Sequence, residues 1–299
     1  METIRKNDQA RRLTFETEPG IRLAADAYGT PSERCVVLLH GGGQTRHSWG
    51  ETARWMASAG WYAISLDIRG HGDSSWSPEG HYTVDYLISD LKEVIRQIGG
   101  SPALVGASLG GIISLLAIGE SQSSIASGLV LVDVAPRVEQ QGVERIFRFM
   151  SANVDGFASL EEAADAVAAY LPQRPRPSDL SRLEKNLRLK PSANGGPDRY
   201  YWHWDPKFLS VWQQFASATT EQRIGYEERL FTAARALSAP TLIVRGGISD
   251  VVSEKVMTEF LDVVPHAQSV NVAEAGHMVA GDSNHAFSRT VIQFLNSSL

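Results

Sequence analysis

A turn of small residues around Ser108 is the first place where this sequence could carry out covalent chemistry. Residues 106–110 read Gly-Ala-Ser-Leu-Gly, follow the short apolar run 102–105 and precede the helix-like run 112–118. A strand, a sharp turn and a helix in this order place the serine hydroxyl at the end of a sheet, beside the free N–H groups that begin a helix. Such a serine can attack a carbonyl carbon, because the helix N-terminus stabilises the oxyanion that forms.

A serine nucleophile needs a base and a carboxylate that holds the base in the right tautomer, and the sequence offers both. His277 leaves a later apolar run through a glycine turn, and we expect it to be the general base. Asp250 lies just past another apolar run, at the sheet edge where sites of parallel sheets collect, and is the expected acid. Asp133, directly after a third run, is the alternative acid. Strand-end geometry and the chain order Ser, Asp, His favour Asp250 over it.

A glycine-rich loop after an early apolar run could supply the second oxyanion donor. Residues 40–43 read His-Gly-Gly-Gly and lack side chains where backbone N–H groups must approach a substrate oxygen. We expect the N–H groups of Gly42 and Leu109 to hold the oxyanion, with Gly43 as the alternative to Gly42. The histidine that opens this loop, and His71 in a later glycine-rich turn, are expected to make structural hydrogen bonds.

These residues need a sheet to position them, and the chain alternates short apolar runs with amphipathic stretches. Continuous apolar runs, typical of strands buried on both faces, lie at residues 36–39, 62–66, 103–105, 128–132 and 241–244. Helical periodicity lies at 49–59, 83–98, 110–119 and 254–263. Residues 12–28 read as an antiparallel hairpin. We therefore predict an α/β fold in which a mostly parallel sheet carries helices on both faces.

The alternation breaks after residue 135 and resumes near residue 239. Residues 143–150 and 160–171 have helical periodicity, and proline-containing breakers lie at 172–177 and 192–197. A structureless loop of this length is improbable in a compact domain. The sequence therefore predicts a core domain over residues 1–135 and 238–299, with an inserted helical cap over 136–237.

The composition limits the classes of protein to which this chain can belong. The chain has 299 residues, of which 43% are hydrophobic, enough for one large domain with an insertion. Its net charge of −6 argues against nucleic acid and anionic membrane surfaces as partners. The absence of a long apolar run argues against a membrane span, and the polar start of the chain and the single Cys35 favour a cytoplasmic protein. Composition gives no indication of the oligomeric state.

Several loop motifs together resemble those of the α/β-hydrolase family. The residues that carry the resemblance lie at 40–43, 67–74 (Asp-Ile-Arg-Gly-His-Gly-Asp-Ser), 106–111, 247–250 and 276–277. The resemblance covers most of the chain outside the predicted cap. It implies the α/β-hydrolase fold with an eight-stranded sheet, no metal, no organic cofactor, and a cap that roofs the substrate pocket.

The type of nucleophile narrows the reaction. The loop motifs are similar to those of epoxide hydrolases and haloalkane dehalogenases, whose nucleophile is an aspartate. A carboxylate that attacks an sp³ carbon forms an ester that water can cleave, whereas Ser108 would form an inert ether. The expected reaction is therefore hydrolysis of a carboxylic ester or a related carbonyl substrate through an acyl-enzyme on Ser108.

Other functions are compatible with the same residues. Lactonases and carbon–carbon bond hydrolases resemble this chain in fold and triad. In the second group a cap arginine holds a substrate carboxylate, a role that Arg188 could take, although a solvated helix face is the other interpretation of this residue. A ligand receptor or regulatory protein of the same fold is the alternative from a different class.

Apolar and aromatic residues of the predicted cap indicate the lining of a pocket for a small molecule. Residues 200–204 read Tyr-Tyr-Trp-His-Trp, and most of these side chains are expected to pack the cap on the core. One or two would reach a substrate with an apolar or aromatic acyl or alcohol group. The expected substrate-contacting residues are Phe147, Met150, Trp202, Trp204 and Met278.

Overall fold

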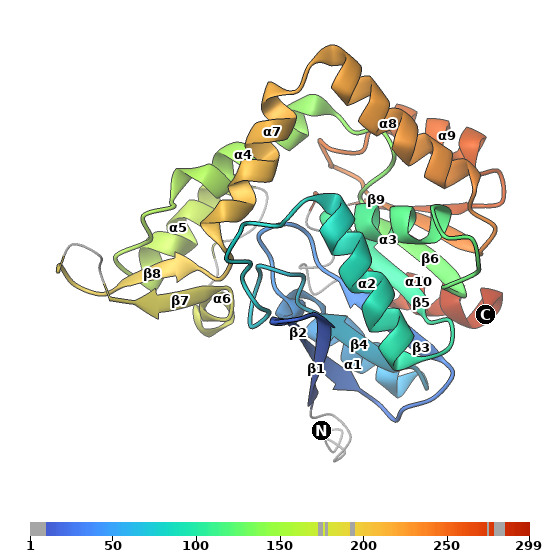
Figure 1. Cartoon of the computed structure of the whole chain (residues 1–299), viewed down its shortest axis with the longest axis horizontal. Helices are drawn as coiled ribbons and strands as arrows, with labels where there is room; N and C mark the ends of the chain where they lie inside the picture. The colour runs from blue at the N-terminus through green and yellow to red at the C-terminus, as the bar shows by residue number, and fades with distance from the viewer. Residues whose placement is uncertain (1–9, 173–175, 177–178, 192–194, 274, 278–284) are drawn as a thin grey trace.

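A central sheet with helices on both faces organises the molecule (Figure 1). The computed structural model describes residues 10–172, 176, 179–191, 195–273, 275–277 and 285–299. In this part of the chain an eight-stranded sheet has the order β1 (Arg11–Glu18), β2 (Ile21–Tyr28), β4 (Tyr62–Leu66), β3 (Cys35–Leu39), β5 (Ala103–Ala107), β6 (Gly128–Val132), β9 (Thr241–Gly246) and β10 (Gln268–Val272). The pairs β1–β2 and β2–β4 are antiparallel and the other pairs are parallel. The predicted fold class and the predicted N-terminal hairpin are confirmed.

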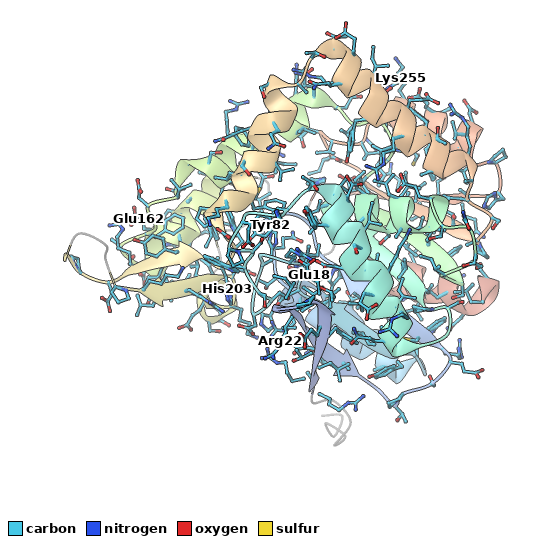
Figure 2. All side chains as sticks on the ribbon, viewed as in Figure 1. Glu18, Arg22, Tyr82, Glu162, His203 and Lys255 are labelled. Carbon is cyan, nitrogen blue, oxygen red and sulfur yellow. The ribbon has the colours of Figure 1, made fainter. Side chains whose placement is uncertain are left out.

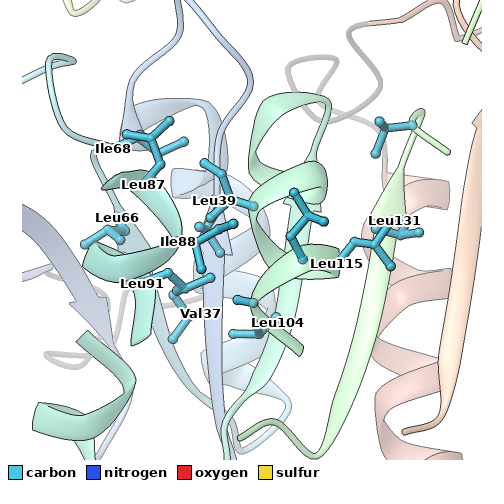
Figure 3. Packing of buried hydrophobic residues seen from close by; sticks show 14 of the residues in the cluster. Val37, Leu39, Leu66, Ile68, Leu87, Ile88, Leu91, Leu104, Leu115 and Leu131 are labelled. Carbon is cyan, nitrogen blue, oxygen red and sulfur yellow. The ribbon is translucent and has the colours of Figure 1, made fainter. Parts of the chain in front are cut away.

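The central strands are apolar throughout because both faces of the sheet are covered. All residues of β3, β5 and β6 are buried. Successive residues of β3 alternate between two buried clusters, with Val36 and Leu38 in one and Val37 and Leu39 in the other. Figure 3 shows the second cluster, in which β3 packs against helices α2 (Val84–Ile98) and α3 (Leu109–Gly119).

The two faces of the sheet carry different helices. Helices α2, α3, α8 (Thr220–Arg235) and α9 (Glu254–Val263) contribute to the cluster on one face. Helices α1 (Gly50–Ser58) and α10 (His285–Ser298) contribute to the cluster on the other face. The 3-10 turn Arg46–Trp49 precedes α1. The predicted core helices lie where expected, and α10 is an additional helix that covers the sheet.

The insertion after β6 contains more than helices. It holds α4 (Gln140–Ala152), α5 (Leu160–Tyr170), α6 (Ser181–Glu184), β7 (Leu187–Lys190), β8 (Arg199–Trp202), a 3-10 turn (Pro206–Phe208) and α7 (Leu209–Ser217), and it ends with α8. Strands β7 and β8 form an antiparallel hairpin, which the helical pattern did not predict. Helix α8 packs on α3 and α9 of the core, so the last helix of the insertion covers the sheet (Figure 1).

One segment of the insertion is bound to the core through its backbone. Trp204 forms an isolated β-bridge with His71. The hydroxyl of Tyr82 donates a hydrogen bond of 2.6 Å to the Asp205 carboxylate, and both residues are buried. Figure 2 shows Tyr82 and His203 at this junction. The loop that carries the 67–74 motif is therefore also the place where the insertion is attached.

The contact between α3 and α8 can be tested with two glycines. A Cβ atom at Gly119 would lie 2.3 Å from the carbonyl oxygen of Ala233, whereas one at Gly225 would meet nothing within 4 Å. We expect Gly119→Ala to lower the free energy of unfolding by about 1 to 3 kcal/mol. Gly225→Ala, the matched control within α8, should raise it by about 0.4 to 1 kcal/mol. Urea denaturation measures both, and equal effects would contradict the close packing of these helices.

Candidate active site

Ser108 lies at the turn between β5 and α3 with a backbone conformation that L residues rarely adopt, φ 46° and ψ −115°. A Cβ atom at Gly106 would lie 2.4 Å from the carbonyl oxygen of Gly110, and one at Gly110 would lie 2.5 Å from the carbonyl oxygen of Leu39. Glycine is therefore required on both sides of the serine. A strained residue of this kind costs about 1 to 3 kcal/mol and persists only where its surroundings determine it.

Asp133 is the carboxylate that contacts His277. The distance between Asp133 Oδ2 and His277 Nδ1 is 2.7 Å, and Asp133 is fully buried. Asp133 also accepts hydrogen bonds from the Gly246 N–H at 2.8 Å and from the Ser249 hydroxyl at 2.5 Å. Three donors thus fix this carboxylate. With Nδ1 bound to Asp133, the other ring nitrogen of His277 is the one that can accept a proton.

The structure corrects the expected choice of acid, because Asp250 is paired with a different residue. Its carboxylate binds Arg145 through two hydrogen bonds, from Nε at 2.6 Å and from Nη2 at 2.9 Å. Strand order explains the difference: β6, which ends before Asp133, lies directly beside β5, whereas β9, which precedes Asp250, lies one strand further from the serine. Both carboxylates are at the expected sheet edge, and Asp133 is the one in contact with His277.

Hydrogen bonds in the glycine-rich loop at residues 40–43, here called the oxyanion loop, favour the N–H of Gly42 over that of Gly43 as the second oxyanion donor. The N–H of Gly43 donates to Nε2 of His71 at 3.1 Å, so the alternative donor is already occupied. Gly42 lines the same cavity as Ser108. Leu109 is the first residue of α3, where a backbone N–H has no acceptor within its own helix. The pair Gly42 and Leu109 therefore remains the better-supported choice.

Two buried histidines hold this loop. His40 is bonded through Nδ1 to the carbonyl oxygen of Gly41 at 2.8 Å and accepts at Nε2 from the Ile68 N–H at 3.0 Å. His71 is bonded through Nδ1 to the Arg69 carbonyl oxygen at 3.1 Å. Burial lowers the pKa of His40 to about 4 and that of His71 to about 3. Both rings are therefore neutral at pH 7, as a ring that accepts from a backbone N–H must be.

A buried ionic cluster explains the aspartates of the 67–74 motif. Arg46 is 1% exposed and forms an ion pair with the fully buried Asp67. Its other guanidinium nitrogens lie 2.8 Å from Asp73 Oδ2 and 3.1 Å from Asp26 Oδ2. Asp67 also accepts from the N–H of Arg46 at 2.6 Å and from the N–H of Asp73 at 2.9 Å. This cluster connects the start of the 3-10 turn before α1 to the loop that carries His71.

Ser108 and His277 both line a cavity of about 480 Å³, which residues of the insertion also line. One part of its lining is polar and comes from the turn before α1, from α1 and from the start of the β7–β8 hairpin. The other part is apolar and comes mainly from α4, α5 and β8. Among the lining residues are His47, Ser48, Thr52, Lys185 and Asn186 on the polar side, and Ile146, Phe149, Met150, Val167, Tyr170 and Leu183 on the apolar side.

The cavity includes part of the expected set of substrate-contacting residues. Met150, Trp202 and Trp204 line it. Phe147 does not, because α4 presents Ile146, Phe149 and Met150, residues three and four apart, to the cavity. Met278 lies outside the described residues. Phe149 and Tyr170 were not predicted, although the helical periodicity of both segments was visible in the sequence.

Arg188 does not line the cavity. Its guanidinium lies 3.3 Å from the Asp73 carboxylate and 3.4 Å from the carbonyl oxygen of Gly72. Within the described residues no group of three or more His, Cys, Asp or Glu side chains could hold a metal ion. In the same part of the chain, none of the helices is both long and apolar enough to cross a membrane.

Comparison with known proteins agrees with this fold. The sequence matches the family described as the alpha/beta hydrolase family over residues 36–290. It is 30% identical over 258 residues to the esterase Rv0045c of Mycobacterium tuberculosis, covering 84% of this chain and 79% of that protein. It is 28% identical over 267 residues to a 3-hydroxybutyrate-oligomer hydrolase of Cupriavidus necator, covering 86% and 87% of the two chains. The crystal structure of E-2-(acetamidomethylene)succinate hydrolase shares the fold, with a TM-score of 0.79 at 21% identity over 96% of this chain and 100% of that one.

The neutral histidines predict how stability depends on pH. In the unfolded chain His40 and His71 take up protons near pH 6.5, whereas in the folded chain they do so only near pH 4 and pH 3. As the pH falls below 6.5 the unfolded state therefore binds more protons, and the free energy of unfolding should decrease until the folded histidines protonate.

Urea denaturation from neutral pH down to about pH 4.5 measures this decrease. The variant His71→Gln keeps an acceptor for the Gly43 N–H and removes one of the two titrating rings. It should show a shallower decrease than the unchanged protein, which serves as the reference for all other titrating groups. Identical slopes would contradict a neutral, buried His71.

Proposed function

This chain belongs to the alpha/beta hydrolase family and is a hydrolase, and we propose that it cleaves carboxylic esters through an acyl-enzyme on Ser108. The observation that carries the proposal is the pairing of His277 with the buried Asp133, in a cavity that also exposes the strained Ser108. The relatives named as an esterase and as an oligomer hydrolase support the same type of reaction.

Acylation begins when the Ser108 hydroxyl attacks the ester carbonyl and gives its proton to Nε2 of His277. Asp133, bonded to Nδ1, stabilises the imidazolium and keeps the ring in the tautomer that the reaction needs. The N–H groups of Gly42 and Leu109 stabilise the oxyanion of the tetrahedral intermediate. When the intermediate collapses, the imidazolium returns the proton to the leaving alkoxide, and the alcohol departs.

Deacylation repeats these steps with water as the nucleophile. His277 removes a proton from the water molecule that attacks the acyl-enzyme, and the same two N–H groups hold the second oxyanion. Collapse breaks the bond to Ser108 Oγ, which recovers its proton from His277 and releases the carboxylic acid. Each group returns to its initial protonation state, so the cycle needs no cofactor.

The lining of the cavity favours a substrate with one apolar or aromatic group. Phe149, Tyr170, Trp202 and Trp204 surround the apolar part, and such rings provide a large contact area. The position of Arg188, beside Asp73 and outside the cavity, does not support the carboxylate-binding role that carbon–carbon bond hydrolysis would require. Lactones present the same reacting group as esters and are included in the proposal.

Removal of the nucleophile or of the acid tests the mechanism. Ser108→Ala should abolish turnover of p-nitrophenyl esters from acetyl to decanoyl, because the acyl-enzyme can no longer form. Asp133→Asn should lower kcat by about 10³ to 10⁴, since the amide no longer holds the correct tautomer of His277.

The measurement is the release of p-nitrophenolate, together with mass-spectrometric detection of a fluorophosphonate adduct on Ser108. Ser121→Ala, at a serine whose hydroxyl donates to the Ala117 carbonyl oxygen at the end of α3, is the matched control and should keep full activity. Turnover that survives Ser108→Ala would exclude the mechanism. Absence of turnover on all esters and lactones by the unchanged protein would favour a receptor of the same fold.

A further inference from the structure

An ion pair connects the insertion to the core beside the active site. Arg145 of α4 binds both carboxylate oxygens of Asp250, which lies in the loop after β9, at 2.6 Å and 2.9 Å. The remaining terminal nitrogen of Arg145 donates to the carbonyl oxygen of Tyr170, at the end of α5, at 2.9 Å. The guanidinium also lies 4.8 Å from the centre of the Tyr170 ring. One side chain thus binds the core loop and the end of a second helix of the insertion.

Backbone contacts also hold α4 against the loop that carries Asp250. A Cβ atom at Gly142, one turn before Arg145, would lie 2.3 Å from the carbonyl oxygen of Asp250. The N–H of Glu139 donates to the carbonyl oxygen of Val251 at 2.9 Å. Helix α4 therefore has little freedom to slide or rotate over the loop as long as the ion pair is formed.

Aromatic side chains connect the ion pair of Arg145 and Asp250 to the cavity. The rings of Tyr170 and Phe149 are stacked, with their centroids 4.1 Å apart. Phe149 and Trp202 are in an edge contact, with centroids 5.7 Å apart. Phe157 packs against Trp202 in an edge contact, with the ring centroids 5.1 Å apart. We call Phe149, Tyr170 and Trp202 the aromatic wall, since all of them line the cavity. Arg145 is not among the lining residues, and it contacts Tyr170 of this wall.

The loop that holds Arg145 also borders the catalytic acid. The hydroxyl of Ser249 donates to Asp133 at 2.5 Å and accepts from the N–H of Val251 at 3.1 Å. Asp250 lies between these two residues and faces Arg145. Residues 249–251 therefore fix the distance between the aromatic wall on one side and the pair of Asp133 and His277 on the other.

We propose that Arg145 and Asp250 are positioning residues for substrate selectivity: their ion pair holds the aromatic wall in place relative to Ser108, and preference for an aromatic acyl group over a short aliphatic acyl group depends on it. The proposal rests on the proposed esterase function. An ester with a bulky aromatic acyl group uses the wall to place its carbonyl at Ser108, and a misplacement of about 1 Å can cost about 10²-fold in rate. A short acyl group does not reach the wall and does not depend on it.

The test compares p-nitrophenyl benzoate with p-nitrophenyl acetate. Arg145→Met and Asp250→Asn should each lower kcat/KM for the benzoate at least about tenfold, mainly through kcat, and leave kcat/KM for the acetate within about threefold. Arg145→Lys, which keeps the charge and loses the forked contact, should give an intermediate kcat/KM for the benzoate. Arg137→Met is the matched control, because Arg137 pairs with Glu227 and Glu259 on α8 and α9, outside the cavity, and should change neither ester.

Other outcomes overturn the proposal. If Asp250→Asn lowers kcat for both esters while Arg145→Met does not, Asp250 belongs to the catalytic machinery. If both variants lose activity on both esters in proportion to a loss of unfolding free energy, the ion pair only stabilises the fold. Failure of the esterase function itself is recognised separately, because hydrolysis of both esters would then be insensitive to Ser108→Ala.

Discussion

The turn at Ser108 is the constraint on which the rest of the site depends. Ser108 can keep its backbone φ of 46° only because residues 106 and 110 have no Cβ atom and because α3 approaches the carbonyl of Leu39 closely. This approach fixes the start of α3 against β3, and β3 leads directly into the oxyanion loop. The same turn is bounded on its other side by β6, which ends at Val132, one residue before Asp133. The proposed nucleophile, oxyanion donors and acid thus follow three neighbouring strands.

Around this turn the protein uses neutral donors and acceptors close to the reacting atoms and keeps its ion pairs further away. His40 and His71 hold the loop as uncharged rings, and the arginines pair with carboxylates behind the loop or at the edge of the insertion. A cation in contact with the Asp133 carboxylate would compete with His277 for it and would disfavour the imidazolium. Arg145 is instead satisfied by Asp250, which leaves Asp133 to the histidine.

Much of this could be predicted from the sequence, and the reasons for the failures are physical. Buried strands were predictable because both faces of the sheet require apolar residues, and the nucleophile turn because only glycine fits beside it. The choice between Asp133 and Asp250 depended on strand order, which a single sequence does not state. The distinction between Phe147 and Phe149 depended on the rotation of α4, which is set by the contact of Gly142 with the core. The β7–β8 hairpin has short, partly exposed strands and no buried run to reveal it.

The position of the insertion has a consequence for protein engineering. It begins a few residues after Asp133, so that the proposed nucleophile, the proposed acid and the glycine-rich loop at residues 40–43 all lie on one uninterrupted stretch of chain before it. Exchange of the segment between β6 and β9, the predicted cap, would thus leave that stretch unaltered. A foreign cassette would have to provide a helix that packs on α3 and α9 as α8 does, and new partners for Asp250, for Tyr82 and for the backbone of His71. Compatibility at these attachment points, more than the identity of the catalytic residues, determines which caps this core can accept.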